Sequence, residues 1–272
     1  MEAKLQRRVQ RYGWDRAADV YETAWRSQLA PAQTLLLSMA SLQQGEEVLD
    51  VACGTGLVTL PAAEAVAPGG RLLGTDISGR MVEEATVRTA ATGVDNADFR
   101  RMDGEALELP DQAFDAALCG LGLMYMPHPE SALREMTRVL RPGGRVVAAV
   151  WGERRHCGWA EIFPIVDRRV ESEVCPLFFR LGTKDLLAEI LKALGLKAVA
   201  SRRLKTALHF DDADSAVTAA LYGGPVALAA SRFDKATGRA AAEEYLASIA
   251  PYRKGRAYDI PGEFVVAIGW KG

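Results

Sequence analysis

The chain has 272 residues, of which 49% are hydrophobic and 25% are charged, and its formal net charge is −2. This composition is typical of a globular protein that buries a full core, and it gives no overall attraction to nucleic acid. The four cysteines form no CxxC pair, which fits neither a disulfide framework nor a structural zinc site. With no apolar signal or membrane-spanning segment near the N-terminus, a soluble cytoplasmic protein without stable membrane association is expected.

Residues 1–42 are expected to form an N-terminal helical cap that carries several aromatic side chains, namely Tyr12, Trp14, Tyr21 and Trp25. Its basic run, Lys4–Arg11, is more typical of a solvated helix face than of a phosphate contact.

Five short apolar runs follow at regular spacing, and they are rich in Val, Leu and Ala rather than alternating. Such runs are typical of strands that are covered on both faces. The expected strands are Glu47–Ala52, Arg71–Ile77, Ala97–Met102, Phe114–Gly120 and Arg145–Trp151. The helical patterns between them predict βαβ units and a parallel sheet with right-handed crossovers.

Two of the intervening helices have clear local signals. Ser78 is expected to cap a helix whose inner face carries Met81, Val82 and Ala85. Apolar spacing of i, i+3, i+4 and i+7 predicts a second helix, with its inner face at Leu133, Met136, Thr137 and Leu140. The segment 142–144 (Pro-Gly-Gly) is expected to stop that helix and turn into the next strand.

The second half is less regular. An amphipathic helix at Lys184–Leu194, ended by Gly195, and strands at Lys197–Phe210 and Glu263–Lys271 are expected. Residues 152–182 and 211–258, the latter with a helix around Ala240–Ala247, are predicted to be insertions that form an acceptor-side lid. The expected organisation is one domain, with a cofactor-binding core at 43–151 and with 183–210 and 259–272 completing the sheet.

The stretch VLDVACGTGLVTL, residues 48–60, predicts a buried strand that ends in Gly54 and Gly56 and leads into a helix. Glycines let a ligand approach the backbone, and the N-terminus of the following helix offers free N–H groups. The third glycine of the dinucleotide-binding fingerprint would fall at position 59, which is Thr59, so that fingerprint is incomplete.

Two further acids follow expected strands. Asp76 ends the second strand, where its carboxylate can accept hydrogen bonds from ribose hydroxyls, and Asp103 ends the third, where it can accept from an adenine amine. Because the carboxyl ends of parallel strands meet at one edge of the sheet, these acids and the glycine loop together predict a nucleoside site.

At these motifs the chain resembles the class I S-adenosylmethionine-dependent methyltransferases, in the branch similar to the ubiquinone- and menaquinone-biosynthesis methyltransferases and related small-molecule enzymes. The motifs VLDVACGTG, LLGTDIS, RRMDGEALELPDQAFD and RVLRPGGRVVAAVWG carry the resemblance, which covers roughly residues 45–152. It implies a Rossmann-like α/β fold with helices on both faces of a seven-stranded, mostly parallel sheet. The implied strand order is 3-2-1-4-5-7-6, with the seventh strand antiparallel.

The resemblance also implies roles for individual residues. Asp50 and the loop 54–56 would approach the methionine half of S-adenosylmethionine, Asp76 the ribose, and Asp103 the adenine amine, with Ile77 and Met102 on the adenine faces. Cys53 is expected to serve as a small residue against the ligand rather than as a reactive thiol. The full set of expected cofactor contacts is Trp25, Asp50, Ala52, Cys53, Gly54, Gly56, Asp76, Ile77, Met81, Met102, Asp103, Gly104 and Cys119.

Methyl transfer from a sulfonium needs alignment and exclusion of water, and it needs a general base only if the acceptor arrives protonated. His128 and His156 are the candidate bases, although His128 lies between two prolines and also fits a turn. His209 is interpreted as structural, and Tyr125 as a core residue or an acceptor contact.

Five aromatic residues around the first insertion are expected to form core packing or to line a pocket for a flat or apolar acceptor; they are Trp151, Trp159, Phe163, Phe178 and Phe179. The segment Gly223–Phe233 has the composition of a mobile loop that closes over the same pocket.

The predicted function is transfer of a methyl group to a small organic molecule, at oxygen or carbon of an aromatic or quinone-like acceptor, by a monomer or homodimer. One alternative is a metalloid methyltransferase that binds arsenite through Cys119, Cys157 and Cys175. Another is a non-catalytic or partner-dependent subunit that binds the cofactor. A nicotinamide-dependent oxidoreductase is disfavoured because it would not need an acid at Asp103. An enzyme that modifies nucleic acid is disfavoured because the sequence shows no basic domain.

Overall fold

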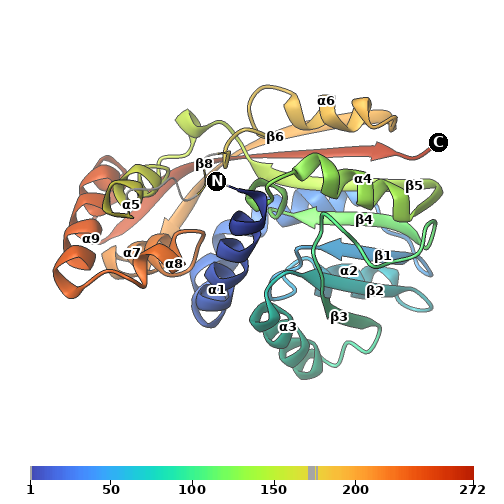
Figure 1. Ribbon diagram of the computed structural model, residues 1–272, viewed down its shortest axis with the longest axis horizontal. Helices are drawn as coiled ribbons and strands as arrows, with labels where there is room; N and C mark the ends of the chain where they lie inside the picture. Colours follow the sequence, from blue (N-terminus) through green and yellow to red (C-terminus); the bar gives the residue numbers. More distant parts are fainter. Residues whose placement is uncertain (1, 171–174, 176) are drawn as a thin grey trace.

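The computed structural model describes residues 2–170, 175 and 177–272, and within them the strands form one mixed sheet (Figure 1). Five strands run parallel: β1 (Glu47–Val51), β2 (Arg71–Asp76), β3 (Ala97–Arg101), β4 (Phe114–Gly120) and β5 (Leu140–Trp151). Each overlaps one of the five expected strands. β1, β4 and β5 are largely buried, as near-continuous apolar sequence predicts, whereas β3, at the sheet edge, is half-buried to exposed.

The C-terminal part closes the sheet with antiparallel strands. β8 (Ala257–Trp270) lies between β5 and β6 (Lys197–Phe210) and is antiparallel to both, and the short β7 (Arg253–Lys254) pairs with the start of β8. The order is β3-β2-β1-β4-β5-β8-β6, which confirms the predicted order with β8 as its last strand. β8 begins six residues before the expected Glu263, because β7 and β8 form a hairpin that the apolar pattern did not reveal.

Helices cover both faces of the sheet and one end of it (Figure 1). In the core these are α2 (Thr59–Val66), α3 (Gly79–Thr92), α4 (Pro129–Val139) and α6 (Leu186–Ala193), with the 3-10 turn η1 (Leu123–Tyr125). The remaining elements are α5 (Ile162–Val170), α7 (Ala213–Leu221), α8 (Ala227–Ala230), α9 (Lys235–Ile249), η2 (Arg154–His156) and η3 (Ala250–Tyr252). In Figure 1, α5 and α7–α9 gather at the end where β6 and β8 extend past the other strands.

The N-terminal cap is one long helix, α1 (Ala3–Ala40), which contains Pro31. It contacts the strands β4, β5, β6 and β8 and also α3, α7 and α8, so it links the nucleoside-side core to the C-terminal helices. Its buried face includes Trp25, Leu29 and Leu36. The prediction of a helical 1–42 segment is therefore confirmed over the described residues.

The N-cap prediction is confirmed. The expected helix faces are partly wrong, because Val82 is half-buried and Leu140 belongs to β5 rather than to α4. The Ser78 hydroxyl accepts a hydrogen bond from the Met81 N–H at 3.1 Å, as expected of an N-cap. In α4 the buried face is formed by Ala132, Leu133, Met136 and Val139, while Thr137 is only half-buried. The segment 142–144 does not turn between elements: β5 begins at Leu140 directly after α4, and Gly143 (φ 78°) lies in a bulge of that strand.

The α5 and α7–α9 helices belong to the two expected insertions, of which residues 171–174 and 176 lie outside the described residues. α5 and α7 both pack on α9, and α8 packs on α1 and α5. The division into core and lid stays a prediction. No helix in the described part of the chain combines the length and apolar character needed to cross a bilayer.

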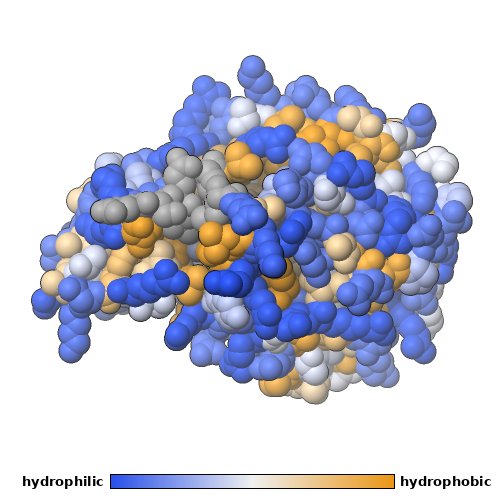
Figure 2. Space-filling view, in the orientation of Figure 1, coloured by the Kyte–Doolittle hydropathy of each residue, from blue (hydrophilic) through white to orange (hydrophobic). Residues whose placement is uncertain are grey.

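The face shown in Figure 2 is largely hydrophilic, and a broad group of apolar residues lies over α6 at its top edge. Large hydrophobic side chains with high exposure are spread over several elements; they are Leu5, Tyr12, Val87, Leu177 and Tyr222.

Candidate functional site

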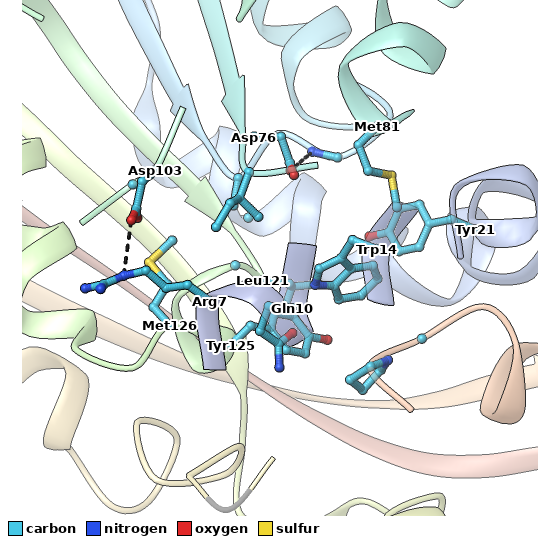
Figure 3. Close-up of a pocket in the computed structure, with 18 of the residues that line it drawn as sticks. Arg7, Gln10, Trp14, Tyr21, Asp76, Met81, Asp103, Leu121, Tyr125 and Met126 are labelled. Atoms are coloured by element: carbon cyan, nitrogen blue, oxygen red, sulfur yellow. Dashed lines mark hydrogen bonds and ion pairs between the residues drawn. The ribbon is translucent and has the colours of Figure 1, made fainter. Parts of the chain in front are cut away.

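A cavity opens at the carboxyl ends of the parallel strands, beneath α1 (Figure 3). Its volume, including the part open to solvent, is ≈ 980 Å³. This is the edge at which open α/β sheets bind their ligands. The loops after β1, β2, β3, β4 and β5 all contribute residues to the wall.

The loop after β1 has an unusual backbone. Ala52, Gly54 and Gly56 have φ values of 57°, 55° and 85°, a region that favours glycine. The Tyr21 ring on α1 lies over this loop, because a Cβ at Gly54 would be 3.6 Å from its Cε1 atom. Ala52 and Gly54 line the cavity, so the backbone itself forms the wall here.

Cys53 is turned away from the cavity wall. Its side chain is 7% exposed, and its Sγ atom would lie 3.1 Å from a Cβ placed at Gly74 of β2. Burial, together with the charges of Asp76 and Asp50, raises the pKa of the thiol well above its usual value. The thiol packs against β2 rather than the cavity, so the expected role of Cys53 as a small residue against the ligand stays a prediction.

Asp76 lies at the end of β2 and lines the cavity. Its Oδ2 accepts a hydrogen bond from the Gly54 N–H and its Oδ1 one from the Ser78 N–H, both at 2.9 Å. Burial raises its pKa from 3.8 to about 6, although these two N–H donors act in the opposite direction. The two donors fix the carboxylate while each oxygen keeps a free lone pair for a ligand hydroxyl.

Asp50 lies in β1, beneath the loop, and is 1% exposed. Its Oδ2 accepts a hydrogen bond from the Thr59 hydroxyl at 2.7 Å, whereas its Oδ1 has no partner among the described residues. Burial raises the pKa of Asp50 to about 7. A buried carboxylate with an unused oxygen is costly, which is common at functional sites.

Asp103 is held by the N-terminal helix. Arg7 Nε lies 3.1 Å from Asp103 Oδ2, and the Arg7 guanidinium also pairs with the buried Glu105 (Figure 3). The Glu105 N–H donates to Asp103 Oδ1 at 2.9 Å. Glu105 also accepts from the His128 N–H, so one acid ties α1, the loop after β3 and the start of α4 together.

Nine of the thirteen expected cofactor contacts line this cavity: Trp25, Ala52, Gly54, Asp76, Ile77, Met81, Met102, Asp103 and Gly104. The other four, Asp50, Cys53, Gly56 and Cys119, do not line it. A Cβ at Gly56 would contact Ala85, Leu60 and Phe99, and one at Gly122 would lie 3.0 Å from the Cys119 sulfur.

The part of the wall farthest from β3 is aromatic. Trp25, Trp151 and Trp159 line it, and their ring centroids lie 4.7–6.3 Å apart. Phe163, Phe178 and Phe179 pack behind Trp159 at 5.5–5.8 Å. Gly224 and Pro225, from the segment predicted to close over the pocket, also belong to the wall.

Sequence reasoning missed a second set of wall residues, which come mainly from α1 and from the loop after β4: Arg7, Gln10, Trp14, Tyr21, Leu29, Glu105, Gly120, Leu121, Gly122, Met126 and Pro127. Trp14, Tyr21 and Trp25 are spaced i, i+7 and i+11, which places them on one face of a helix and was the available signal. Tyr125, an expected acceptor contact, stacks edge-on against Trp14 at 4.9 Å.

Neither candidate base lines the cavity. The His128 side chain is exposed at the start of α4. His156 Nδ1 lies 3.0 Å from Oε1 of the buried Glu263. Burial alone would raise the pKa of Glu263, but His156, the Glu153 N–H and Arg203 hold it below its usual range. The catalytic role of both histidines therefore stays a prediction, and the geometry places other side chains nearer the ligand.

The cysteines do not form a thiolate site. Burial raises the pKa of Cys119, Cys157 and Cys175 to about 12 in each case, so all three are protonated at neutral pH. Among the described residues no group of three His, Cys, Asp or Glu side chains is placed to hold a metal ion. Protonated, buried thiols argue against the metalloid alternative.

The wall fits S-adenosylmethionine on chemical grounds. Asp76 offers acceptors for ribose hydroxyls, Asp103 an acceptor for an amine, and Ile77 and Met102 apolar surfaces for a base. Glycines let segments of the wall pack closely on one another: a Cβ at Gly122 would lie 2.4 Å from the Ala52 Cβ, and one at Gly104 would lie 2.8 Å from Val51 Cγ1.

Known proteins have sequences similar to part of this chain. Residues 48–144 match the family described as a methyltransferase domain. A demethylmenaquinone methyltransferase of Bacillus cytotoxicus is 31% identical over 164 residues, which cover 60% of this chain and 64% of that protein. An uncharacterised Mycobacterium bovis relative is 35% identical over 123 residues, or 43% of its length, so the chain spans less than two thirds of these curated relatives.

Solved structures share the fold. The YcgJ protein of Bacillus subtilis superposes with a TM-score of 0.60 at 19% identity, covering 89% of this chain and 98% of that one. The [4+2]-cyclase SpnF superposes with a TM-score of 0.56 at 24% identity, over 89% and 80% of the two chains. Residues 48–144 thus resemble a methyltransferase domain, the chain is similar to a demethylmenaquinone methyltransferase over 60% of its length, and it shares the fold of these solved structures.

Proposed function

We propose that the protein transfers a methyl group from S-adenosylmethionine to oxygen or carbon of a small aromatic or quinone-like molecule. The observation that carries the proposal is one continuous cavity with two different ends. Its cofactor half, at Asp76, Asp103 and the glycine loop, offers charged and polar groups. Its acceptor half, at Trp25, Trp151 and Trp159, offers flat apolar walls.

When bound, S-adenosylmethionine supplies a methyl carbon that its sulfonium already activates. The protein then has to hold the acceptor in line with that carbon and keep water out. The rings of Trp14, Tyr21 and Tyr125, which lie across the middle of the cavity, suit that positioning role (Figure 3). Burial raises the pKa of both tyrosines well above 10, so their hydroxyls serve as hydrogen-bond donors rather than as bases.

Two other observations support a small-molecule acceptor. Tyr21 and the loop Gly224–Pro225 enclose the cavity, which leaves room for a compact ligand rather than a polymer. The demethylmenaquinone methyltransferase relative is named for an aromatic, quinone-like substrate. A cytoplasmic location and a monomeric or homodimeric state stay predictions.

Cofactor binding without methyl transfer is the competing proposal. This alternative is retained because one fold can host different chemistries, and a structural neighbour of this chain is named a [4+2]-cyclase. Transfer of labelled methyl from S-adenosylmethionine to an acceptor separates the two, since a binding subunit leaves all the label on the cofactor.

The first test is binding of S-adenosylhomocysteine, measured by calorimetry and by the shift in melting temperature. Asp76→Ala is expected to remove most of the shift, because two anchoring N–H bonds and the ribose acceptor are lost together. Asp98→Ala, an exposed acid on β3, is the matched control and keeps the shift. No binding of the ligand at millimolar concentration would end the proposal.

A further inference from the structure

The loop after β1 has a backbone that needs support. Gly54 (φ 55°) and Gly56 (φ 85°) flank Thr55, and both lie in the left-handed region that favours glycine. Glycine has the most conformational freedom to lose, and a ligand that orders such a loop meets this cost. Contacts that hold the loop before the ligand arrives therefore favour binding.

Glu22 and Arg88 hold the residue between these glycines. Glu22 Oε2, on α1, accepts a hydrogen bond from the Thr55 hydroxyl at 3.0 Å, and Arg88 Nη1, on α3, donates to the Thr55 carbonyl oxygen at 2.6 Å. Glu22 Oε2 and Arg88 Nη1 also lie 2.6 Å apart. Thr55 is buried, and the two charged side chains are exposed by a quarter or less, so solvent screens their attraction little. These three residues form the loop clamp.

The same helix reaches the two other loops of the cofactor half. Arg7 Nε lies 3.1 Å from Asp103 Oδ2, after β3, and Asp15 Oδ1 accepts a hydrogen bond from the Ser78 hydroxyl, after β2, at 2.6 Å. Arg7, Asp15 and Glu22 are spaced by eight and seven residues, close to two helical turns each, so they lie on one side of α1. In Figure 3 the α1 side chains extend across the cavity from Arg7, which lies beside Asp103.

The position of the clamped loop indicates which part of the ligand it meets. In the sheet, β3, β2 and β1 are neighbours in that order. A nucleoside with its base amine at Asp103 and its ribose at Asp76 therefore directs the group attached to the ribose toward the loop after β1. In S-adenosylmethionine this group is the methionine half.

We propose that Glu22 and Arg88 are positioning residues that fix the glycine loop for the methionine half of the cofactor, and that docking of α1 and binding of this half favour each other. The inference rests on the proposed function in that the ligand of the loop is S-adenosylmethionine. Neither residue lines the cavity, so both act through Thr55 rather than on the ligand. Such a coupling is reciprocal, so a ligand that orders the loop also holds α1 in place.

The test compares S-adenosylhomocysteine with methylthioadenosine, which has the same nucleoside and a thioether sulfur but lacks the amino-acid part. The two dissociation constants are measured by calorimetry on the full chain. The readout is the ratio of the methylthioadenosine constant to the S-adenosylhomocysteine constant, because this ratio isolates the amino-acid part. A variant that merely destabilises the fold changes both constants alike and leaves the ratio as it was.

Glu22→Gln keeps the size of the side chain and removes its charge, and it is expected to lower that ratio about tenfold, close to the value of one charge-assisted hydrogen bond. Asp19→Asn is the matched control, because Asp19 also joins α1 to α3, through Arg80 at 2.8 Å, but this pair is exposed and its partner is not a loop residue. The control is expected to change the ratio less than about twofold.

A measurement on the wild type does not depend on how the variants fold. Hydrogen exchange at residues 15–25 of α1 is compared with each ligand at saturation. S-adenosylhomocysteine is expected to protect this segment more than methylthioadenosine does, because only the former reaches the loop. Equal protection by the two ligands overturns the inference.

An unchanged ratio in Glu22→Gln, or an equal fall in Asp19→Asn, also overturns it. If neither ligand binds the wild type, the proposed function fails, and hydrogen exchange of the ligand-free proteins decides the clamp separately. Loss of protection at residues 53–58 in Glu22→Gln but not in Asp19→Asn leaves the loop clamp in place, whereas equal protection in all three proteins refutes it.

Discussion

Replacing Asp50 with asparagine is expected to stabilise the protein above neutral pH. The Asp50 carboxyl is 1% exposed and one of its oxygens is unpaired among the described residues, and burial raises its pKa to about 7. In the unfolded chain the pKa returns to 3.8, so the folded protein binds this proton more tightly than the unfolded chain does. Stability is therefore highest below the unfolded pKa and falls as the pH rises through 7.

The size of the effect follows from the two pKa values. A change from 3.8 to about 7 corresponds to about 4 kcal/mol of unfolding free energy lost above pH 8. Asparagine has no proton to lose at this pH. One of its amide atoms would still lack a hydrogen-bond partner in place of Asp50 Oδ1, which costs free energy, so about 4 kcal/mol is the upper limit of the stabilisation. Asp76, whose pKa is raised to about 6, contributes with the same sign in both proteins, and its charge is one of the causes that raise the pKa of Asp50.

Urea unfolding of both proteins between about pH 4 and pH 9 measures this difference. The two unfolding free energies are expected to lie close together at the acid end and to diverge as the pH rises, with the variant the more stable. Two curves that fall in parallel over the whole range would refute the assignment of a neutral, buried Asp50 carboxyl.

Other changes test the cavity from different sides. Because a cationic ligand favours the ionised forms of Asp50 and Asp76, S-adenosylmethionine is expected to bind more tightly as the pH rises from about 5 to 8, by calorimetry; a flat profile contradicts this. Gly122→Ala, whose Cβ would lie 2.4 Å from that of Ala52, is expected to weaken S-adenosylhomocysteine binding at least about tenfold, and wild-type affinity would refute the close approach. Arg7→Gln is expected to reduce hydrogen-exchange protection at residues 3–11 and to cost more than the about 1 kcal/mol of an exposed pair, because the buried Glu105 loses its charged partner; an unchanged unfolding free energy would contradict this. Ser78→Ala removes the N-cap of α3 and is expected to cost about 1 kcal/mol in thermal unfolding; an unchanged melting temperature would argue against the cap.

The cofactor half was accessible from sequence because its residues sit at strand ends. Once the apolar runs are assigned to parallel strands, Asp76 and Asp103 must share an edge with the glycine loop, whatever the helices do. Trp25 was expected to contact the cofactor. Trp14 and Tyr21 were not expected to line the cavity, although they lie on the same face of α1 as Trp25.

The contacts that sequence reasoning missed join segments far apart in the chain. Arg7 reaches Asp103 and Glu105, which are almost a hundred residues away, and no local pattern marks such a pairing. His156 was a candidate base because it follows β5. In the structure its side chain pairs with Glu263, a buried acid at the start of an otherwise apolar stretch of β8, and this pairing could not be seen from the sequence. Strand order predicts which strand ends, and hence which side chains, meet at one edge of a sheet. The direction in which a loop turns at that edge depends on its contacts with other strands, which the order does not give.

The α1 helix spans both ends of the cavity. Arg7, on its first turns, pairs with Asp103 and Glu105, and Trp25, farther along, lies against Trp151 and Trp159. Under the proposed function, one helix therefore contacts both the cofactor half and the acceptor half of the cavity, and a movement of α1 that admits one ligand also loosens the contacts of the other. The exchange rates of the two ligands are then expected to be linked.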